Sequence, residues 1–78
     1  MKKEREKINL QPVHVSTYRF VEKYMTKNVV APEMEEIAKA VKLTIRHTYR
    51  VVDDLCSLGY MGKEAYRRRS IKILKPLQ

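Results

Sequence analysis

The sequence predicts a small α+β domain, mostly α, with three helices followed by a C-terminal two-stranded β-hairpin. Two observations support this prediction. Apolar residues recur at helical spacing in three segments between residues 16 and 58, and the pattern changes to the alternation of strands from Tyr60 onward. A chain of 78 residues suffices for one domain and not for two, so we expect these elements to share one core.

The first predicted helix begins after an N-cap at Ser16 or Thr17 and extends to about Lys27. Phe20 and Tyr24 widen its apolar face to almost half of the circumference. Aromatic residues in such positions usually pack in a core, but their flank is also the candidate surface for self-association.

Composition suggests the boundaries of the domain. Residues 1–15 begin with alternating charges and contain Pro12, so we expect an N-terminal arm there that need not be rigid. The domain then spans residues 16–75, and residues 76–78 form a C-terminal tail.

The second predicted helix opens with Pro32 at its first position, where the missing N–H needs no partner. Three glutamates follow close to its positive end, which favours negative charge. The expected inner face is apolar and consists of Met34, Ile37, Ala38 and Val41. Only two residues, Lys42 and Leu43, separate this helix from the next, so the two helices must cross steeply.

The third predicted helix is capped by Thr44 and ends near Leu58, because Gly59 can adopt the left-handed conformation that terminates a helix. Arg46 and Arg50 lie one turn apart on its outer side, and like charges at that spacing destabilise a helix by about 0.2–0.5 kcal/mol. The opposite side is expected to face the core and consists of Thr48, Val51, Val52 and Leu55.

Two strands are predicted after Gly59, over residues 60–63 and 70–74. In the second strand, Ile71 and Ile73 share one face and Lys72 lies on the other. The residues EAYRRR between the strands are expected to form an exposed hairpin tip, and they include three consecutive arginines.

Charge indicates the class of partner. The formal net charge of +8 and the pI near 9.8 favour a polyanion, with nucleic acid ahead of an anionic membrane surface. Residues 63–75 carry six basic residues against Glu64 alone, so the charge is concentrated in the hairpin. No segment has the apolar run of a signal peptide or membrane span, and the single cysteine, Cys56, cannot form an internal disulfide. We therefore expect a cytoplasmic protein, nucleoid-associated when bound to DNA.

The order of elements is that of a winged helix-turn-helix. Residues 37–61, IAKAVKLTIRHTYRVVDDLCSLGYM, resemble the pattern of winged-helix regulators, in which an Ile-Ala helix leads through a short turn into a recognition helix and a Leu-Gly exit. Residues 20–41, FVEKYMTKNVVAPEMEEIAKAV, are similar to the DNA-binding domain of the LexA repressor family. The resemblance covers about residues 16–74, and it implies a DNA-binding domain whose hairpin is the wing.

Two features depart from the LexA pattern. The turn position that is often Gly in such proteins is Lys42, so a left-handed backbone there would cost about 1 kcal/mol. The 78-residue sequence also leaves no room for the self-cleaving peptidase and dimerisation domain of full LexA-type repressors, so autoproteolysis is not implied.

In this interpretation the helix over residues 44–58 enters the major groove by its basic amino-terminal half. Either Arg46 or Arg50 can make a bidentate contact to guanine. Tyr49 or His47 can reach a phosphate or a base edge, and Thr44 at the cap is placed for a phosphate. Without DNA, we expect Arg50 to pair with one of the two aspartates that follow it, Asp53 or Asp54.

The basic hairpin supplies the second set of candidate DNA contacts, from residues 63–70 to the backbone or the minor groove, whose negative potential attracts basic side chains. The candidates are Lys63, Tyr66, Arg67, Arg68 and Arg69.

No enzymatic function is expected. The serines lack a base or an orienting partner, and no paired carboxylates or Gly-rich phosphate loop are present. His14, His47 and Cys56 do not have the spacing of a metal site, and Cys56 is more simply a small core residue. The sequence therefore predicts no catalytic residue, metal or cofactor.

The leading hypothesis is a sequence-specific regulator that binds double-stranded DNA, acting as a repressor of the kind encoded by phages, plasmids or compact prokaryotic genomes. A homodimer, if the chain forms one, would use helix 16–28 and the arm. The alternative is a winged-helix module that binds another regulator or a polymerase through the same surface. A third hypothesis, RNA or left-handed DNA, is disfavoured because the sequence has no Trp and because Tyr49 and Asp53 occupy the helix positions where domains specific for left-handed DNA have Asn and Tyr.

Overall fold

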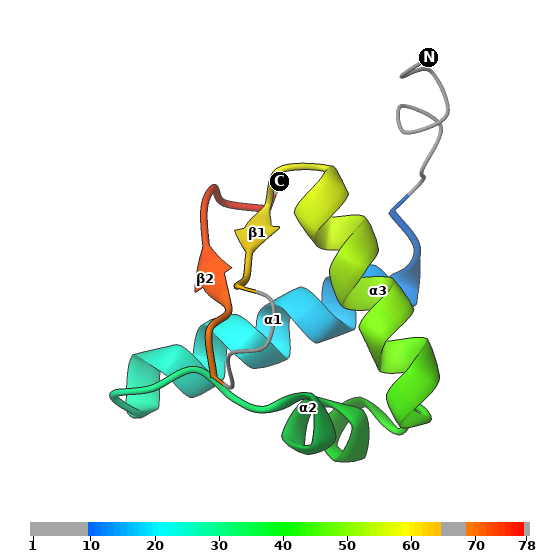
Figure 1. Ribbon diagram of the computed structural model, residues 1–78, viewed down its shortest axis with the longest axis horizontal. Coiled ribbons are helices and arrows are strands. Elements are labelled where there is room, and N and C mark those ends of the chain that lie inside the picture. The colour runs from blue at the N-terminus through cyan, green and yellow to red at the C-terminus, as the bar shows by residue number, and fades with distance from the viewer. Residues whose placement is uncertain (1–9, 65–68, 78) are drawn as a thin grey trace.

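The computed structural model describes residues 10–64 and 69–77, which form a small, mostly helical α+β fold (Figure 1). Three helices precede two short strands: α1 (Pro12–Lys27), α2 (Met34–Val41), α3 (Ile45–Ser57), β1 (Met61–Gly62) and β2 (Lys72–Ile73). The predicted number and order of elements are therefore confirmed. None of the helices in the described part of the chain is long and apolar enough to cross a membrane.

Helix α1 begins at Pro12 and not after Ser16 or Thr17, so the predicted start was wrong. Pro12 occupies the first turn, where its fixed φ suits the helix and its missing N–H needs no partner. Gln11 is the N-cap, and its backbone N–H donates to Nδ1 of His14 at 2.9 Å. Residues 12–15, which were expected to belong to the arm, are thus helical.

Helix α2 begins at Met34 with Glu33 as its N-cap. Pro32 therefore precedes the cap, and the prediction that it occupies the first position of the helix was wrong. The carboxylate of Glu36 accepts the backbone N–H of Glu33 at 2.7 Å, which satisfies a donor at the helix start. The helix ends at Lys42, whose backbone is left-handed, with φ 60° and ψ 46°. The non-glycine residue of the turn therefore does occupy the conformation that glycine would favour.

Helix α3 has the predicted cap, inner face and exit. The Thr44 hydroxyl accepts the backbone N–H of His47 at 3.1 Å, and Gly59 follows the helix with a φ of +88°. All four residues of the predicted inner face are buried: Thr48, Val51, Val52 and Leu55. Cys56 lies beside them, half-buried against the core as expected, and burial raises the pKa of its thiol.

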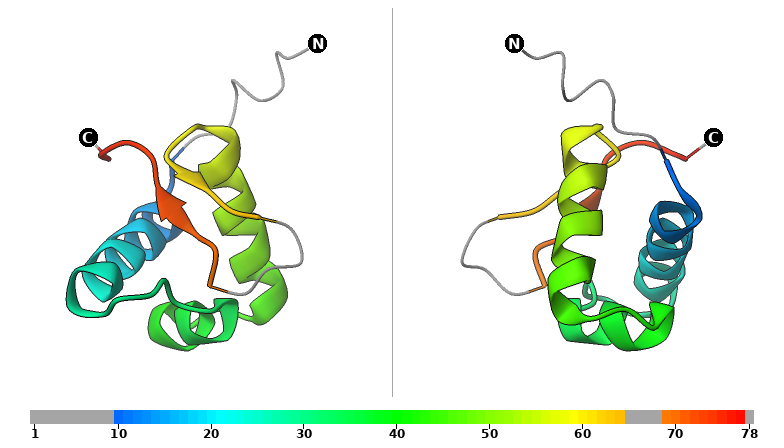
Figure 2. Two further views of the ribbon diagram at one scale, coloured as in Figure 1. Left: turned by 60° about the vertical axis from the view of Figure 1, so that its left-hand side comes forward. Right: turned by 90° about the vertical axis from the view of Figure 1, so that its right-hand side faces the viewer.

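The core lies between the helices and extends to the strands. The right-hand view of Figure 2 shows α1 and α3 on opposite sides, with α2 closing one end. Strands β1 and β2 are antiparallel, with Met61 opposite Ile73 and Gly62 opposite Lys72, and they are shorter than the predicted strands. The buried apolar residues come from the three helices, from β1 and from the chain that precedes α2 and flanks β2: Tyr18, Val21, Ala31, Ile37, Ala38, Val51, Val52, Leu55, Met61, Ile71 and Leu77.

The end of the described chain is part of this core. Leu77 was expected to lie in a C-terminal tail, but its side chain is buried. The hydroxyl of Tyr18 in α1 donates to the backbone oxygen of Lys75 at 3.0 Å, which fixes this segment against the first helix. Lys75 also lies over the ring of Tyr60, with Nζ 4.7 Å from the ring centroid.

Candidate nucleic-acid interface

The outer face of α3 is exposed and basic in its amino-terminal half. Arg46, His47, Tyr49 and Arg50 are all exposed, opposite the buried inner face of the same helix. Thr44 is exposed at the cap, and although its oxygen accepts the His47 N–H, its hydroxyl hydrogen remains able to donate. These five predicted residues thus lie together on one surface, at the end of the helix where the dipole is positive.

The arginines of this surface carry uncompensated charge. Across residues 10–64 and 69–77, no acidic side chain forms an ion pair with Arg46 or Arg50. The prediction that Arg50 pairs with Asp53 or Asp54 is wrong, because both carboxylates have partners from other elements. Asp53 Oδ1 lies 3.1 Å from Lys63 Nζ, and Asp54 Oδ2 lies 3.0 Å from His14 Nε2.

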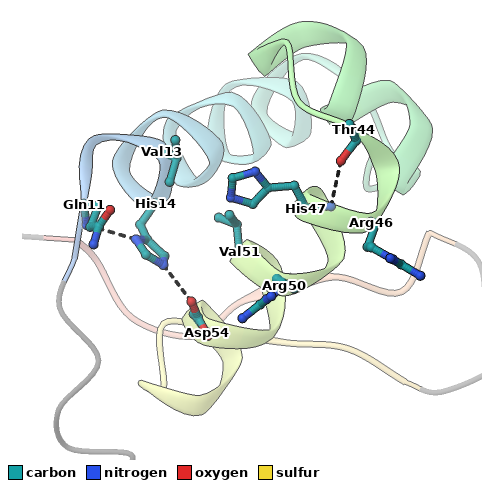
Figure 3. Close-up of a pocket in the computed structure, with 9 residues that line it drawn as sticks. All are labelled: Gln11, Val13, His14, Thr44, Arg46, His47, Arg50, Val51 and Asp54. Atoms are coloured by element: carbon teal, nitrogen blue, oxygen red, sulfur yellow. Dashed lines mark hydrogen bonds and ion pairs between the residues drawn. The ribbon is translucent and has the colours of Figure 1, made fainter.

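A groove of about 360 Å³ lies beside this surface, between the start of α1 and α3 (Figure 3). Side chains from the two helices approach each other across it, with Val13 and His14 on the α1 side and His47 and Val51 on the α3 side. The remaining lining residues are Gln11, Thr44, Arg46, Arg50 and Asp54. Four basic or imidazole side chains against one carboxylate make the groove suited to anionic groups such as phosphates.

Lys63, directly after β1, belongs to the same surface. Its Nζ lies 5.6 Å from the centroid of the Tyr49 ring and also pairs with Asp53, so it extends across the outer side of α3. The structure therefore brings a predicted hairpin residue next to predicted helix residues.

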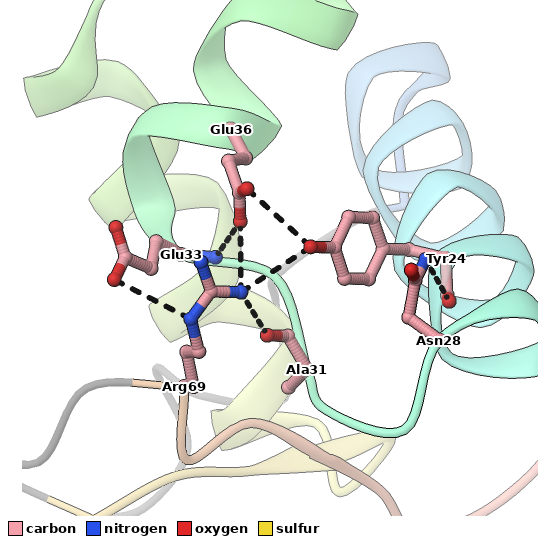
Figure 4. Close-up of polar contacts among 6 residues, drawn as sticks. All are labelled: Tyr24, Asn28, Ala31, Glu33, Glu36 and Arg69. Atoms are coloured by element: carbon pink, nitrogen blue, oxygen red, sulfur yellow. Dashed lines mark hydrogen bonds and ion pairs between the residues drawn. The ribbon is translucent and has the colours of Figure 1, made fainter.

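Arg69 lies apart from this group, in a network at the start of α2 (Figure 4). Its Nη1 donates to the Tyr24 hydroxyl at 3.2 Å, to the Ala31 carbonyl at 3.0 Å and to Glu36 Oε1 at 3.2 Å, while its Nε lies 3.5 Å from Glu33 Oε2. The hydrogen bond from the Glu33 N–H lowers the pKa of Glu36, and the charge of Arg69 lowers it further. The guanidinium of Arg69 thus has intramolecular partners, whereas the sequence suggested a contact to DNA.

The other predicted hairpin contacts, Tyr66, Arg67 and Arg68, lie outside the described residues. Sequence analysis also missed Gln11 and His14, which line the groove but were assigned to the arm. The signal that could have placed them is Pro12, since Pro at the first helical position indicates a helix start immediately after Gln11.

Comparison of the chain with models of known protein families gives no matching family, and comparison with curated protein sequences gives no match. The resemblance to the LexA family therefore stays a prediction, and inference of function depends on the geometry of α3 and its neighbours.

Proposed function

We propose that this chain is a sequence-specific regulator that binds double-stranded DNA through α3 as the recognition helix of a winged helix-turn-helix. The observation that best supports the proposal is the pair Arg46 and Arg50, exposed one turn apart and without acidic partners in the described part of the chain. Two guanidinium groups one turn apart repel each other and destabilise the helix. Bound DNA would offset this repulsion, because its phosphates carry the opposite charge.

The arrangement of charge along α3 supports entry into the major groove by the amino-terminal end. The basic residues and the positive dipole occupy that end, while Asp53 and Asp54 lie in the carboxyl-terminal half. Arg46 and Arg50 are the candidates for bidentate contacts to guanine, because each such contact discriminates against the wrong base by about 1–3 kcal/mol. The acidic half would remain outside the groove.

The neighbours of α3 are proposed to hold the phosphate backbone. Thr44 can donate its hydroxyl hydrogen, while His47 and Lys63 lie on either side of the arginines and can reach adjacent phosphates. The segment between β1 and β2 is proposed as the wing, which contacts the backbone or minor groove through its basic residues. For Arg69 we propose a supporting role, which anchors the end of this segment to α2.

A repressor role is proposed because a DNA-binding domain can block the access of other proteins to its site by binding alone. A dimer would form through α1 and the segment before it, where the side chains of Val15 and Leu10 are 37% and 39% exposed. Such a dimer would favour a two-fold symmetric site, since operator symmetry follows protein symmetry.

The decisive experiment is selection of bound sequences from a pool of random duplexes, followed by titration of the enriched duplex. The proposal predicts an enriched motif and at least tenfold weaker binding, or about 1.4 kcal/mol, for the R46A/R50A double variant. Arg19→Ala serves as the matched control, because Arg19 is an exposed arginine of α1 that pairs with Glu22. Absence of any enriched motif and of any retardation at low salt would contradict the proposal, and a protein recovered by pull-down would then favour the interaction module.

A further inference from the structure

The two aspartates of α3 stand where they could neutralise Arg50. Asp53 and Asp54 follow it by three and four residues, which are the spacings at which oppositely charged side chains pair on a helix. Each carboxylate instead contacts a residue from another element, Lys63 for Asp53 and His14 for Asp54. The fold thus diverts both acids away from the arginine.

The contact between His14 and Asp54 has a defined direction. The side chain of His14 is only 7% exposed, and its Nδ1 accepts the backbone N–H of Gln11 at 2.9 Å. A ring nitrogen that accepts a hydrogen bond carries no proton, so the neutral ring has its hydrogen on Nε2 and donates it to Asp54 Oδ2 at 3.0 Å. Both ring nitrogens are therefore used, and the imidazole is held between the N-cap of α1 and the carboxylate of α3.

Loss of this contact would leave Asp54 next to Arg50. The two side chains line the same groove, one turn apart on α3 (Figure 3). A carboxylate without its imidazole donor would gain most from the nearest guanidinium, because a charge-assisted, bidentate pair is the strongest contact available to it. An Arg50 paired in this way would have to break the pair before it could contact DNA.

We propose that His14 is a positioning residue of the DNA-binding surface: by holding Asp54, it keeps Arg50 free for DNA. The inference rests on the DNA-binding function proposed for α3. Lys63 pairs with Asp53, but that pair is exposed, with the Asp53 side chain 60% accessible, so it holds its carboxylate more weakly than the buried histidine holds Asp54.

A double-mutant cycle on the selected duplex tests this role. His14→Leu replaces the donor with an apolar side chain of similar size, and it should weaken binding about tenfold, because Arg50 must then break its pair with Asp54 before it can contact DNA. The same substitution in the D54N background should change the affinity less than about twofold, since the competing carboxylate is then absent. His14→Gln retains a donor in place of Nε2, and it should preserve binding.

The outcomes separate positioning from mere folding. A structural role of His14 would produce the same loss with and without D54N, and that result would overturn the proposal. If the single variant His14→Leu, which retains Asp54, bound the duplex with unchanged affinity, the proposal would be overturned as well. Circular dichroism of each variant checks that the helices are retained at the temperature of the titration.

A second measurement does not need DNA. In nuclear magnetic resonance spectra of the free His14→Leu protein, the Nε–H proton of Arg50 should exchange more slowly with water, because it becomes bonded to Asp54. Addition of D54N should restore the faster exchange, and an unchanged rate in His14→Leu would contradict the inference. If the wild type binds no duplex, the proposed function fails, whereas this measurement still decides whether His14 keeps Asp54 from Arg50.

Discussion

Arg69 Nη1 and Glu36 Oε1 lie 3.2 Å apart and join residues that are 33 positions apart in the chain (Figure 4). The same guanidinium donates to the hydroxyl of Tyr24 in α1 and to the carbonyl of Ala31 before α2. The same carboxylate accepts the backbone N–H of Glu33, the N-cap of α2. One guanidinium therefore fixes the chain that leads into β2 to the first two helices.

The first prediction concerns the pH dependence of this network. The pKa of Glu36 lies below that of an ordinary glutamate, chiefly because the carboxylate accepts the Glu33 N–H and also because Arg69 is near, although partial burial acts in the opposite direction. Because the folded-state pKa is lower than the unfolded one, ionised Glu36 stabilises the fold above the unfolded pKa. This contribution is lost as the pH falls through the folded pKa.

We therefore expect Glu36→Gln to be less stable than the wild type at pH 7 in urea denaturation, with a difference that begins to shrink below the ordinary glutamate pKa of about 4.3 and is lost below the lower folded-state pKa. Glu35→Gln is the matched control, since Glu35 is an exposed residue of the same helix turn. A difference that persists unchanged in acid would show that the carboxylate charge is not the cause.

The left-handed turn between α2 and α3 gives the second prediction. Lys42 has a φ of 60°, a conformation that costs a non-glycine residue about 1–2 kcal/mol. Lys42→Gly should therefore stabilise the protein by about 0.5–1 kcal/mol after the greater flexibility of glycine in the unfolded chain is subtracted. Lys39→Gly, at an exposed position within α2, should instead destabilise by about 1 kcal/mol, as measured by the midpoint of denaturation. Equal losses for both variants would contradict strain at Lys42.

Much of the fold follows from local sequence. The cap at Thr44, the exit at Gly59 and the inner face of α3 were all predictable, because helical spacing and capping residues act within a few positions. The start of α1 was not, because Pro12 is compatible both with an interruption and with the first turn of a helix. In the folded chain, the bond from the Gln11 N–H to His14 and the contact of His14 with α3 both favour the second choice.

The candidate site was predictable in part for the same reason. Exposure of Arg46 and Arg50 follows from the helical pattern, but the partners of the aspartates do not. Asp54 contacts His14 across 40 positions, while the spacing rule for helices considers only the nearby Arg50. Arg69 likewise contacts Tyr24 across 45 positions, so a local pattern of three arginines could not distinguish it from its neighbours.

The third prediction compares two buried threonines. The Thr17 hydroxyl is buried and has no hydrogen-bond partner among the described residues, whereas the Thr48 hydroxyl donates to the Thr44 carbonyl at 2.9 Å. Thr17→Val should stabilise the protein by about 1 kcal/mol, because it removes a desolvated polar group without a partner. Thr48→Val should destabilise it by about 0.5–1.5 kcal/mol through the lost hydrogen bond. Calorimetric melting temperatures that shift in the same direction for both variants would refute this distinction.

The last prediction separates contacts to bases from contacts to phosphates. Arg46→Ala or Arg50→Ala should each cost about 1–3 kcal/mol on the selected duplex and little on a scrambled one, because a bidentate contact to guanine depends on sequence. Lys63→Ala should weaken binding to both duplexes similarly, because a contact to phosphate does not depend on the base sequence. Wild-type affinity should fall with salt at a logarithmic slope of about −4 to −5 if roughly five phosphates are neutralised, and Lys63→Ala should reduce the slope by about one. A uniform loss on both duplexes from all three substitutions would mean that α3 binds DNA by charge alone, since a helix that distinguishes bases must lose more on its own site than on another.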